Sequence, residues 1–205
     1  MGHYFASKIF KVEVDKIYIY PLGGITKLNI DLNINPIKEF VIIIFGPIFQ
    51  NIAYLILINF FDREIVLTYH LSILLFNLLP IYPLDGGKIV NLLIGKFIPY
   101  KKSLKFSIYI SYIFIISLFI KSKNIKLNII ITITLLVILT IKEHQKIGYK
   151  YNKFILERYL NNYKFKNCKI INSENDLYRN NRHLIKIKDK YYLEKEYFEK
   201  KIKKN

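Results

Sequence analysis

Four long apolar runs, separated by short polar segments, dominate the middle of the chain. They cover residues 37–61, 65–81, 104–120 and 125–141, and a shorter apolar piece covers residues 89–98. A helix needs roughly 20 apolar residues to cross a hydrocarbon core of about 30 Å. The four long runs therefore predict membrane-spanning helices, whereas the fifth piece is too short to span.

Polar and mixed segments flank these runs on both sides. In residues 11–30, an alternation of apolar and polar residues around Pro21-Leu-Gly-Gly24 predicts two strands joined by a glycine turn. Residues 142–205 are charged and rich in tyrosine, and their pattern predicts a small α+β unit. We thus expect an α-helical multi-span membrane core over residues 1–141, with a small strand-rich segment at the membrane edge, and a small α+β C-terminal domain.

Composition adds a strong positive charge to this apolar pattern. The 205 residues are 52% hydrophobic and carry a formal net charge of +17. These properties conflict in a soluble globule but fit a membrane protein with basic flanks and a basic tail. Because lysine and arginine accumulate in cytosolic loops, we place the tail, the segment 8–36 and the loop 96–105 in the cytosol. His3 and Asp85 then lie on the same side of the membrane, although three lysines oppose this topology: Lys121, Lys123 and Lys126.

The sequence Asn77-Leu-Leu-Pro-Ile-Tyr-Pro-Leu-Asp-Gly-Gly87 stands at the end of the second apolar run. Pro80 and Pro83 lack an amide hydrogen and clash with a continuing helix, so we expect the helix to end just before them. A carboxylate such as Asp85 is costly inside a membrane and usually marks a site. Gly86 allows a turn or the close approach of another backbone. Since irregular backbone at membrane depth needs protein or water around it, the motif predicts a wet pocket. The alternative is a plain turn where the chain leaves the membrane.

The spacing N-x-x-P-x-x-P-x-D-G, formed by Asn77, Pro80, Pro83, Asp85 and Gly86, resembles the second metal-site motif of the site-2 protease family. Members of that family are intramembrane zinc metalloproteases. The resemblance implies that Asp85 is a zinc ligand. It also implies that Asn77, Pro80, Pro83 and Gly86 shape the groove in which an extended substrate lies.

The beginning of the sequence resembles part of the first motif of the same family, H-E-x-x-H. Met1-Gly2-His3 looks like the last three letters of His-Glu-x-Gly-His, which implies that His3 is a second zinc ligand. The first histidine and the general-base glutamate would then lie upstream of Met1, and no catalytic base is present in the sequence as given. We expect that sequence to bind zinc poorly and not to hydrolyse, and we expect the true start to lie upstream. The alternatives are a fragment or a degenerate copy.

The order of features along the chain resembles the sporulation branch of the family. His3 is followed by the strand-rich segment, by Gly46-Pro47-x-x-x-Asn51 and by the aspartate motif, and residues 153–159 resemble the helix that leads into that branch's C-terminal domain. The resemblance implies a sporulation sigma-factor precursor as the membrane-associated substrate, cut from the mother-cell cytosolic side, and inhibitory membrane partner proteins. The substrate strand would pair near residues 11–30. The tail would be a reduced CBS-like domain, and without a phosphate-binding glycine loop it does not favour nucleotide binding.

Several residues of chemical interest have simpler interpretations. His70 lies too far along a straight helix to share a metal with Asp85, and we expect an interface histidine near the outer end of its span. Gly46 and Pro47 favour a kink or a close helix contact. Asn51 favours a hydrogen bond between helices.

The remaining polar residues are not expected to act in catalysis. Glu39 opens a span on the lysine-flanked side and is a poor replacement for the missing base. His144 and His183 lie in the tail and are expected to be solvated. The interleaved lysines and tyrosines of the tail resemble a nucleic-acid surface. A solvated face attracted to anionic lipid accounts for them as well, and no direct nucleic-acid binding is expected.

Two functions of other classes remain open. A non-catalytic membrane protein would hold clients in the same groove, because the sequence lacks the first His and the Glu of H-E-x-x-H. A small transporter or channel component would use Asp85 as an ion-path carboxylate, and internal repeats would favour it. We find no such repeats in the sequence.

Overall fold

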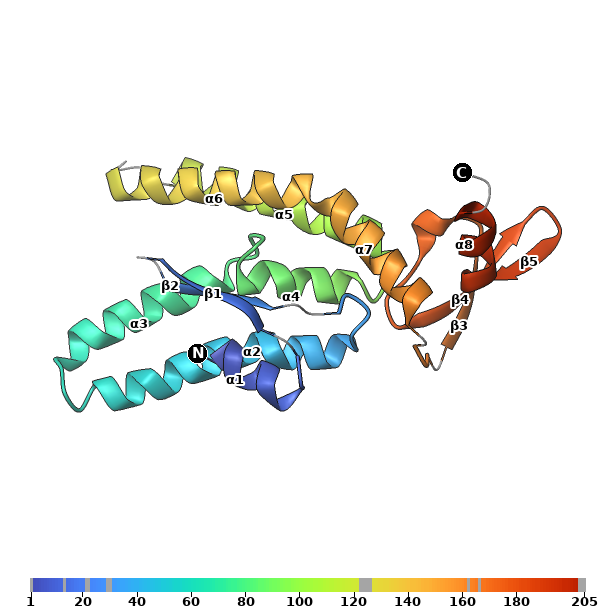
Figure 1. The fold of residues 1–205 in the computed structure, drawn as a ribbon. Helices are drawn as coiled ribbons and strands as arrows, with labels where there is room; N and C mark the ends of the chain where they lie inside the picture. Colours follow the sequence, from blue (N-terminus) through green and yellow to red (C-terminus); the bar gives the residue numbers. More distant parts are fainter. Residues whose placement is uncertain are drawn as a thin grey trace.

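The structure is a computed structural model that describes residues 2–12, 14–20, 23–28, 31–121, 127–161, 163–165 and 167–202. Within these residues, six helices form the core: α1 (Gly2–Ile9), α2 (Pro36–Leu57), α3 (Arg63–Leu78), α4 (Asp85–Ile94), α5 (Tyr100–Lys121) and α6 (Leu127–Gln145). Helices α2 and α3 form one hairpin, α5 and α6 run side by side, and α4 lies between the two pairs (Figure 1). The predicted fold class, a helical multi-span membrane core with small strand-containing parts, is confirmed.

Within the described residues, three helices are long and apolar enough to cross a membrane: α2, α5 and α6. Helix α3 begins at Arg63, where Asp62 caps it, and it is shorter than the apolar run that predicted a span because it ends at Leu78, ahead of Pro80. Its 16 residues extend about 24 Å at 1.5 Å per residue, which is less than the hydrocarbon core of about 30 Å.

Two short strands precede α2. β1 (Val14–Tyr20) pairs antiparallel with β2 (Gly23–Leu28), and Ile17 lies opposite Thr26. Pro21 and Leu22 of the predicted turn lie outside the described residues. The strands separate α1 from α2 in sequence, yet these two helices pack on each other, and Ala6 of α1 is fully buried.

The tail consists of α7 (Ile147–Leu160), β3 (Asn167–Ile171), the short 3₁₀ helix η1 (Glu174–Asp176), β4 (Asn181–Ile187), β5 (Lys190–Leu193) and α8 (Glu194–Ile202). The sheet order is β3-β4-β5, with β3 parallel and β5 antiparallel to β4. Phe154 of α7 and Ile185 of β4 share one buried cluster with Tyr100 and Leu104 of α5. The tail therefore packs directly on the end of the helical core (Figure 1).

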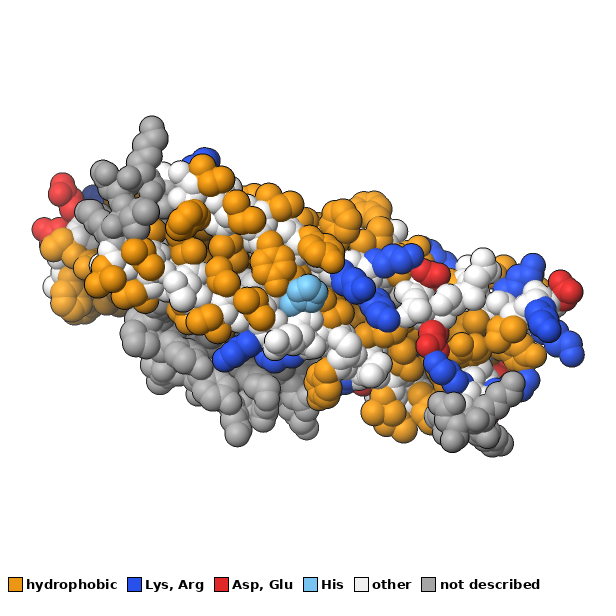
Figure 2. Space-filling view, turned by 90° about the horizontal axis from the view of Figure 1, so that it is seen from above, with side chains coloured by type: hydrophobic (Ala, Val, Ile, Leu, Met, Phe, Trp, Pro, Cys, Tyr) orange, Lys and Arg blue, Asp and Glu red, His pale blue; other side chains and the backbone are white. Residues whose placement is uncertain are grey.

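The surface changes character along the molecule. Hydrophobic side chains cover the face above α5 and α6, and lysine and arginine side chains gather toward the tail (Figure 2). The exposed apolar residues include Ile113, Ile116, Phe119, Ile131 and Ile138. Apolar faces of this extent are unfavourable in water and suit a lipid environment. The protein is an integral membrane protein.

Candidate metal centre

His3 and Asp85 meet where α1 and α4 both pack against α2. His3 lies in the first turn of α1 and Asp85 is the first residue of α4, and both helices pack against α2. The His3 Nε2 atom lies 3.1 Å from Asp85 Oδ2. Two side chains that are far apart in sequence are thus brought into direct contact.

The His3 ring is held in one orientation by α2. Its Nδ1 atom lies 3.0 Å from the carbonyl oxygen of Ile42, and because a carbonyl can only accept, Nδ1 carries the hydrogen. A Cβ atom on Gly46 would overlap the ring, 2.5 Å from Nε2. Gly46 therefore makes room for the ring, and the lone pair of a neutral imidazole points from Nε2 toward Asp85.

This arrangement places two hydrogen-bond acceptors face to face. A neutral His3 presents a lone pair at Nε2, and the ionised Asp85 carboxyl has only acceptor oxygens. At 3.1 Å the two atoms repel each other unless a proton or a metal cation lies between them. The pair is therefore chemically suited to hold a cation, since a backbone carbonyl on the other ring nitrogen is the usual support of a metal-bound histidine.

Asp85 has a different partner on each of its oxygens. Oδ2 faces His3, and Oδ1 accepts a hydrogen bond from Lys88 Nζ at 3.1 Å. The Asp85 side chain is only 11% exposed. A buried carboxylate needs such partners, and the positive end of the α4 dipole also favours it.

Residues 79–84 join α3 to α4 and are called the strap. The strap is fixed by polar side chains of the neighbouring helices. The Tyr82 amide donates to Ser111 Oγ on α5 at 2.8 Å, and the Tyr82 carbonyl accepts from Thr140 Oγ1 on α6 at 3.0 Å. Both main-chain groups of Tyr82 are satisfied away from water, as backbone at this depth requires. The following residue, Pro83, is joined through a cis peptide bond.

Glycines let α4 begin directly against the strap. A Cβ atom on Gly86 would overlap the carbonyl oxygen of Leu78, and one on Gly87 would lie 2.5 Å from the Ile81 carbonyl carbon. These neighbours are backbone atoms that cannot move aside cheaply. The glycines thus permit the close backbone approach that the sequence suggested, and they hold Asp85 at a fixed place on the strap.

The comparisons with known proteins agree with this geometry. The sequence profile of Peptidase family M50 matches residues 63–120, which include the strap and Asp85. This part of the chain is therefore similar to Peptidase family M50, which contains the site-2 proteases. The solved structure of the site-2 protease from Methanocaldococcus jannaschii aligns with a TM-score of 0.56 and 25% identity, over 69% of this chain and 70% of that one. The family resemblance seen in the sequence is therefore confirmed.

Two curated relatives extend the comparison. Stage IV sporulation protein FB of Bacillus subtilis is 30% identical over 171 residues, which cover 78% of this chain and 59% of that protein. Zinc metalloprotease MJ0392 of Methanocaldococcus jannaschii is 35% identical over 116 residues, covering 51% and 33% respectively. The chain thus spans 59% and 33% of the lengths of these relatives.

The two donor groups at this place are of the kinds that bind zinc. Zinc in proteins is bound by imidazole nitrogen and carboxylate oxygen, and catalytic sites use three protein ligands and one open position. His3 and Asp85 supply two such donors at one place. In the described part of the chain, no group of three or more His, Cys, Asp or Glu side chains is placed to hold a metal ion. The assignment of His3 and Asp85 as zinc ligands stays a prediction.

The other residues of the motif surround this pair. Asn77 lies in the last turn of α3, and Pro80 and Pro83 lie on the strap, all three half-buried. Gly86 follows Asp85 in the first turn of α4. Their proposed contact with substrate is not tested by this structure.

Three polar residues of the helical core differ from expectation or gain a partner. His70 is buried in the contact between α2 and α3, where its ring stacks on that of Tyr54 with the ring centroids 4.6 Å apart. Asn51 does not join two helices, because its Nδ2 reaches the Pro47 carbonyl of its own helix at 2.9 Å. Glu39 is paired with Arg179 of the tail at 2.5 Å.

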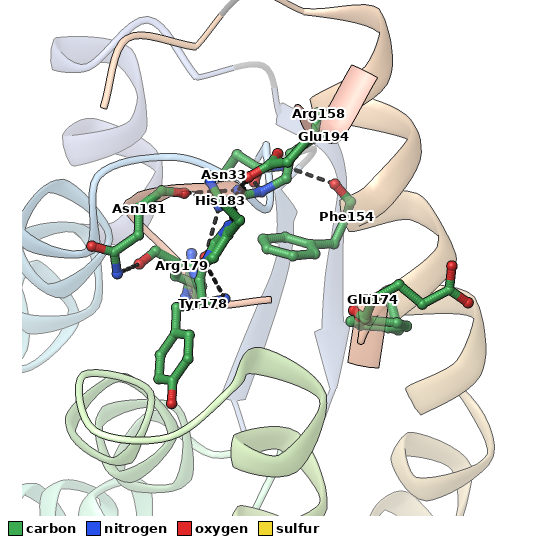
Figure 3. A network of polar contacts seen from close by, with 10 residues as sticks. Asn33, Phe154, Arg158, Glu174, Tyr178, Arg179, Asn181, His183 and Glu194 are labelled. Carbon is green, nitrogen blue, oxygen red and sulfur yellow. Dashed lines mark hydrogen bonds and ion pairs between the residues drawn. The ribbon is translucent and has the colours of Figure 1, made fainter. Parts of the chain in front are cut away.

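A buried polar network holds the tail together (Figure 3). The Arg158 guanidinium on α7 donates to Glu194 Oε1 at 2.9 Å and to the Tyr178 carbonyl at 2.7 Å. His183 Nδ1 lies 2.6 Å from the same Glu194 oxygen, and its Nε2 accepts from the Tyr178 amide at 3.0 Å. Burial lowers the pKa of His183, although the Glu194 hydrogen bond opposes this. All these groups satisfy one another, so the network stabilises the tail.

The expectation of two solvated tail histidines is half right. His144 is exposed in the last turn of α6. His183 is fully buried, because alternate residues of β4 point inward and His183 and Ile185 share the buried face. The charged composition of the tail concealed this short inward-facing pattern.

Proposed function

We propose that the protein is an intramembrane zinc metalloendopeptidase that cleaves a membrane-associated precursor protein. The observation that carries this proposal is the contact of His3 Nε2 with Asp85 Oδ2 at 3.1 Å, beside a strap held by two neighbouring helices. The match of residues 63–120 to Peptidase family M50 supports it, as does the similarity to zinc metalloprotease MJ0392.

The residues of this chain hold and orient the parts of the site. Zinc would be held by His3 Nε2 and Asp85 Oδ2, and when bound it polarises a scissile carbonyl and lowers the pKa of a bound water. Ile42 fixes the ring of His3 through its carbonyl. By family resemblance the general base is the glutamate of H-E-x-x-H, a motif that the given sequence does not contain.

The substrate would lie in extended form along the strap. In this proposal Asn77, Pro80, Pro83 and Gly86 line its groove, and a substrate strand pairs with the edge of the β1–β2 sheet by main-chain hydrogen bonds. The sheet has two strands in the described part of the chain and so offers open edges.

The finer identity of the substrate follows from the similarity to stage IV sporulation protein FB. It would be a sporulation sigma-factor precursor, cut on the cytosolic, mother-cell side, and inhibitory membrane proteins would be partners. The basic tail and the positive-inside rule support a cytosolic tail. Residues 1–141 would form the protease core and residues 142–205 the reduced CBS-like domain.

The test uses the full-length natural protein in detergent, with its N-terminus defined by intact mass. We expect bound zinc in the purified protein and zinc-dependent cleavage of a co-reconstituted membrane-associated precursor. His3→Ala and Asp85→Asn should each abolish cleavage and lower the zinc content, whereas His144→Ala, at an exposed histidine, should do neither. Zinc content and cleavage that are insensitive to both site variants would contradict the proposal.

A second candidate is a non-catalytic protein that holds clients in the same groove. Holding a client would use the strap and the edges of the β1–β2 sheet, and it requires neither a general base nor a complete zinc site. It predicts that the precursor binds with equal affinity to the wild type and to Asp85→Asn, and that added zinc causes no cleavage in either.

A further inference from the structure

We infer that Lys88 is a positioning residue of the metal centre. It engages one oxygen of Asp85, so that only the other oxygen can face the metal. This inference rests on the proposed function, because it assigns a role to Lys88 within that site.

The division of the Asp85 carboxylate between two partners carries the inference. Lys88 Nζ lies 3.1 Å from Oδ1, and His3 Nε2 lies 3.1 Å from Oδ2. Asp85 and Lys88 are three residues apart on α4, a spacing that puts their side chains on one face of a helix. The same helix turn therefore supplies both the ligand and the group that restrains it.

The backbone of Asp85 needs no further restraint, whereas its side chain does. Gly86 and Gly87 seat the first turn of α4 against backbone atoms of the strap. The carboxyl group can still rotate about its own bonds, and a rotation would exchange the oxygen that faces His3. A charge-assisted hydrogen bond from Lys88 to Oδ1 opposes this rotation.

Lys88 suits this role because of its chemistry and its place. An ammonium group donates three hydrogen bonds and accepts none, so while charged it cannot bind a cation itself. An exposed pair of this kind contributes little, but the Asp85 side chain is only 11% exposed and that of Lys88 only 38%. Screening by water is correspondingly weak at the carboxylate.

Restricting Asp85 to one oxygen has a consequence for coordination. A carboxylate that engages a metal through both oxygens uses two coordination positions. Catalytic zinc sites keep one position open for water or substrate. By occupying Oδ1, Lys88 keeps Asp85 a one-oxygen ligand and leaves that position open.

The experiment compares Lys88→Arg, Lys88→Gln and Lys88→Met in the full-length natural protein. Zinc affinity is measured by competition with a chelator, and the cobalt-loaded protein is examined by absorption spectroscopy, which reports coordination number. Removing a side chain that hydrogen-bonds to a metal ligand typically lowers the metal affinity about 10- to 100-fold. We therefore expect the methionine variant to lose zinc affinity by about this factor. Arginine should restore the affinity, glutamine should fall between the two, and the cobalt spectrum of the methionine variant should shift toward higher coordination.

Two controls separate this role from a general structural one. Lys96→Met removes an exposed lysine just beyond α4 and should leave zinc affinity and the cobalt spectrum unchanged. In an Asp85→Asn background, Lys88→Met should cause no further loss, since Lys88 acts through the carboxylate.

The outcomes distinguish this inference from the proposed function. If Asp85→Asn weakens zinc binding while Lys88→Met and Lys88→Gln leave affinity and spectrum unchanged, the role of Lys88 is wrong and the zinc site stands. If His3→Ala and Asp85→Asn leave zinc binding unchanged, the proposed site is wrong and the role of Lys88 falls with it.

Discussion

The Nε atom of Arg158 on α7 donates to Oδ1 of Asn33 at 2.7 Å, and this bond joins the tail to the loop between β2 and α2. The side-chain Nδ2 of Asn33 also donates to the Phe154 carbonyl of α7 (Figure 3). The loop leads directly into α2, which carries the Ile42 carbonyl and Gly46 beside His3. The tail and the candidate metal centre are therefore linked through one continuous set of packed elements.

Replacing Arg158 by methionine should loosen the tail. The Arg158 side chain is 1% exposed. Its removal leaves the Glu194 carboxylate without the guanidinium and Oδ1 of Asn33 without its hydrogen-bond donor. Breaking a buried ion pair in this way costs about 3–5 kcal/mol. Hydrogen exchange of the β4 amides should quicken accordingly.

Arg182 provides the matched control for this change. It lies on the same strand as His183 but its side chain is exposed, so Arg182→Met should leave exchange in β4 unchanged. Equal exchange rates in the wild type and in Arg158→Met would show that the network does not stabilise the tail.

The contact between α7 and the loop should depend on pH through Glu157. Burial, and then the hydrogen bond and the charge of Asp31, raise the pKa of Glu157 to about 7 from an ordinary value of 4.5. The folded state thus holds this proton more tightly than the unfolded state. The stability that the neutral Glu157 contributes is fully present below pH 4.5 and is lost as the pH rises through about 7.

A comparison of melting temperatures at pH 5 and pH 8 tests this dependence. The wild type should lose more stability between these values than Glu157→Gln, because glutamine stays neutral throughout. Glu199→Gln, at an exposed glutamate on α8, should behave like the wild type. Identical pH profiles for the wild type and Glu157→Gln would refute the assignment.

A single methyl group on Gly46 should disturb the metal centre more than the fold. The Cβ of an alanine would overlap the His3 ring, and the ring can move aside whereas the α2 backbone stays. We expect Gly46→Ala to weaken zinc binding with little change in melting temperature. Gly148→Ala is the control, because its Cβ would meet nothing within 4 Å. Unchanged zinc affinity in Gly46→Ala would mean that His3 does not bind the metal.

Much of the site could be predicted because its signals are local. The prolines ahead of Asp85 indicated a helix end and the glycine after it a close backbone approach, and both are present. Charge along the whole chain placed His3 and Asp85 on the same side of the membrane, and the family resemblance implied that they share one metal. Neither prediction needed knowledge of which helices touch.

The support around the site left no comparable signal. Ser111 and Thr140 are each one of several small polar residues in an apolar helix, and nothing in their spacing points to Tyr82. The bond between Arg158 and Asn33 joins segments from opposite ends of the chain. Of these supporting side chains, Lys88 alone could be predicted from the sequence, because its spacing from Asp85 is that of an ion pair on a helix.

The hydroxyls of Ser111 and Thr140 should prove necessary for the strap. Ser111→Ala leaves the Tyr82 amide without its acceptor and Thr140→Val leaves the Tyr82 carbonyl without this donor, and each unsatisfied buried group costs about 1–3 kcal/mol. Because Asp85 follows the strap directly, we expect a lower zinc affinity and a lower melting temperature in both variants.

Matched controls for these hydroxyls exist on the same two helices. Ser117 of α5 donates to the Phe114 carbonyl, and Thr132 of α6 donates to the Asn128 carbonyl. Each of these bonds stays within its own helix, so Ser117→Ala and Thr132→Val remove a hydroxyl without touching the strap. If these variants lose as much zinc affinity as Ser111→Ala and Thr140→Val, the strap is not what positions Asp85. If they lose none, the position of the carboxylate depends on two hydroxyls from helices that carry no metal ligand themselves.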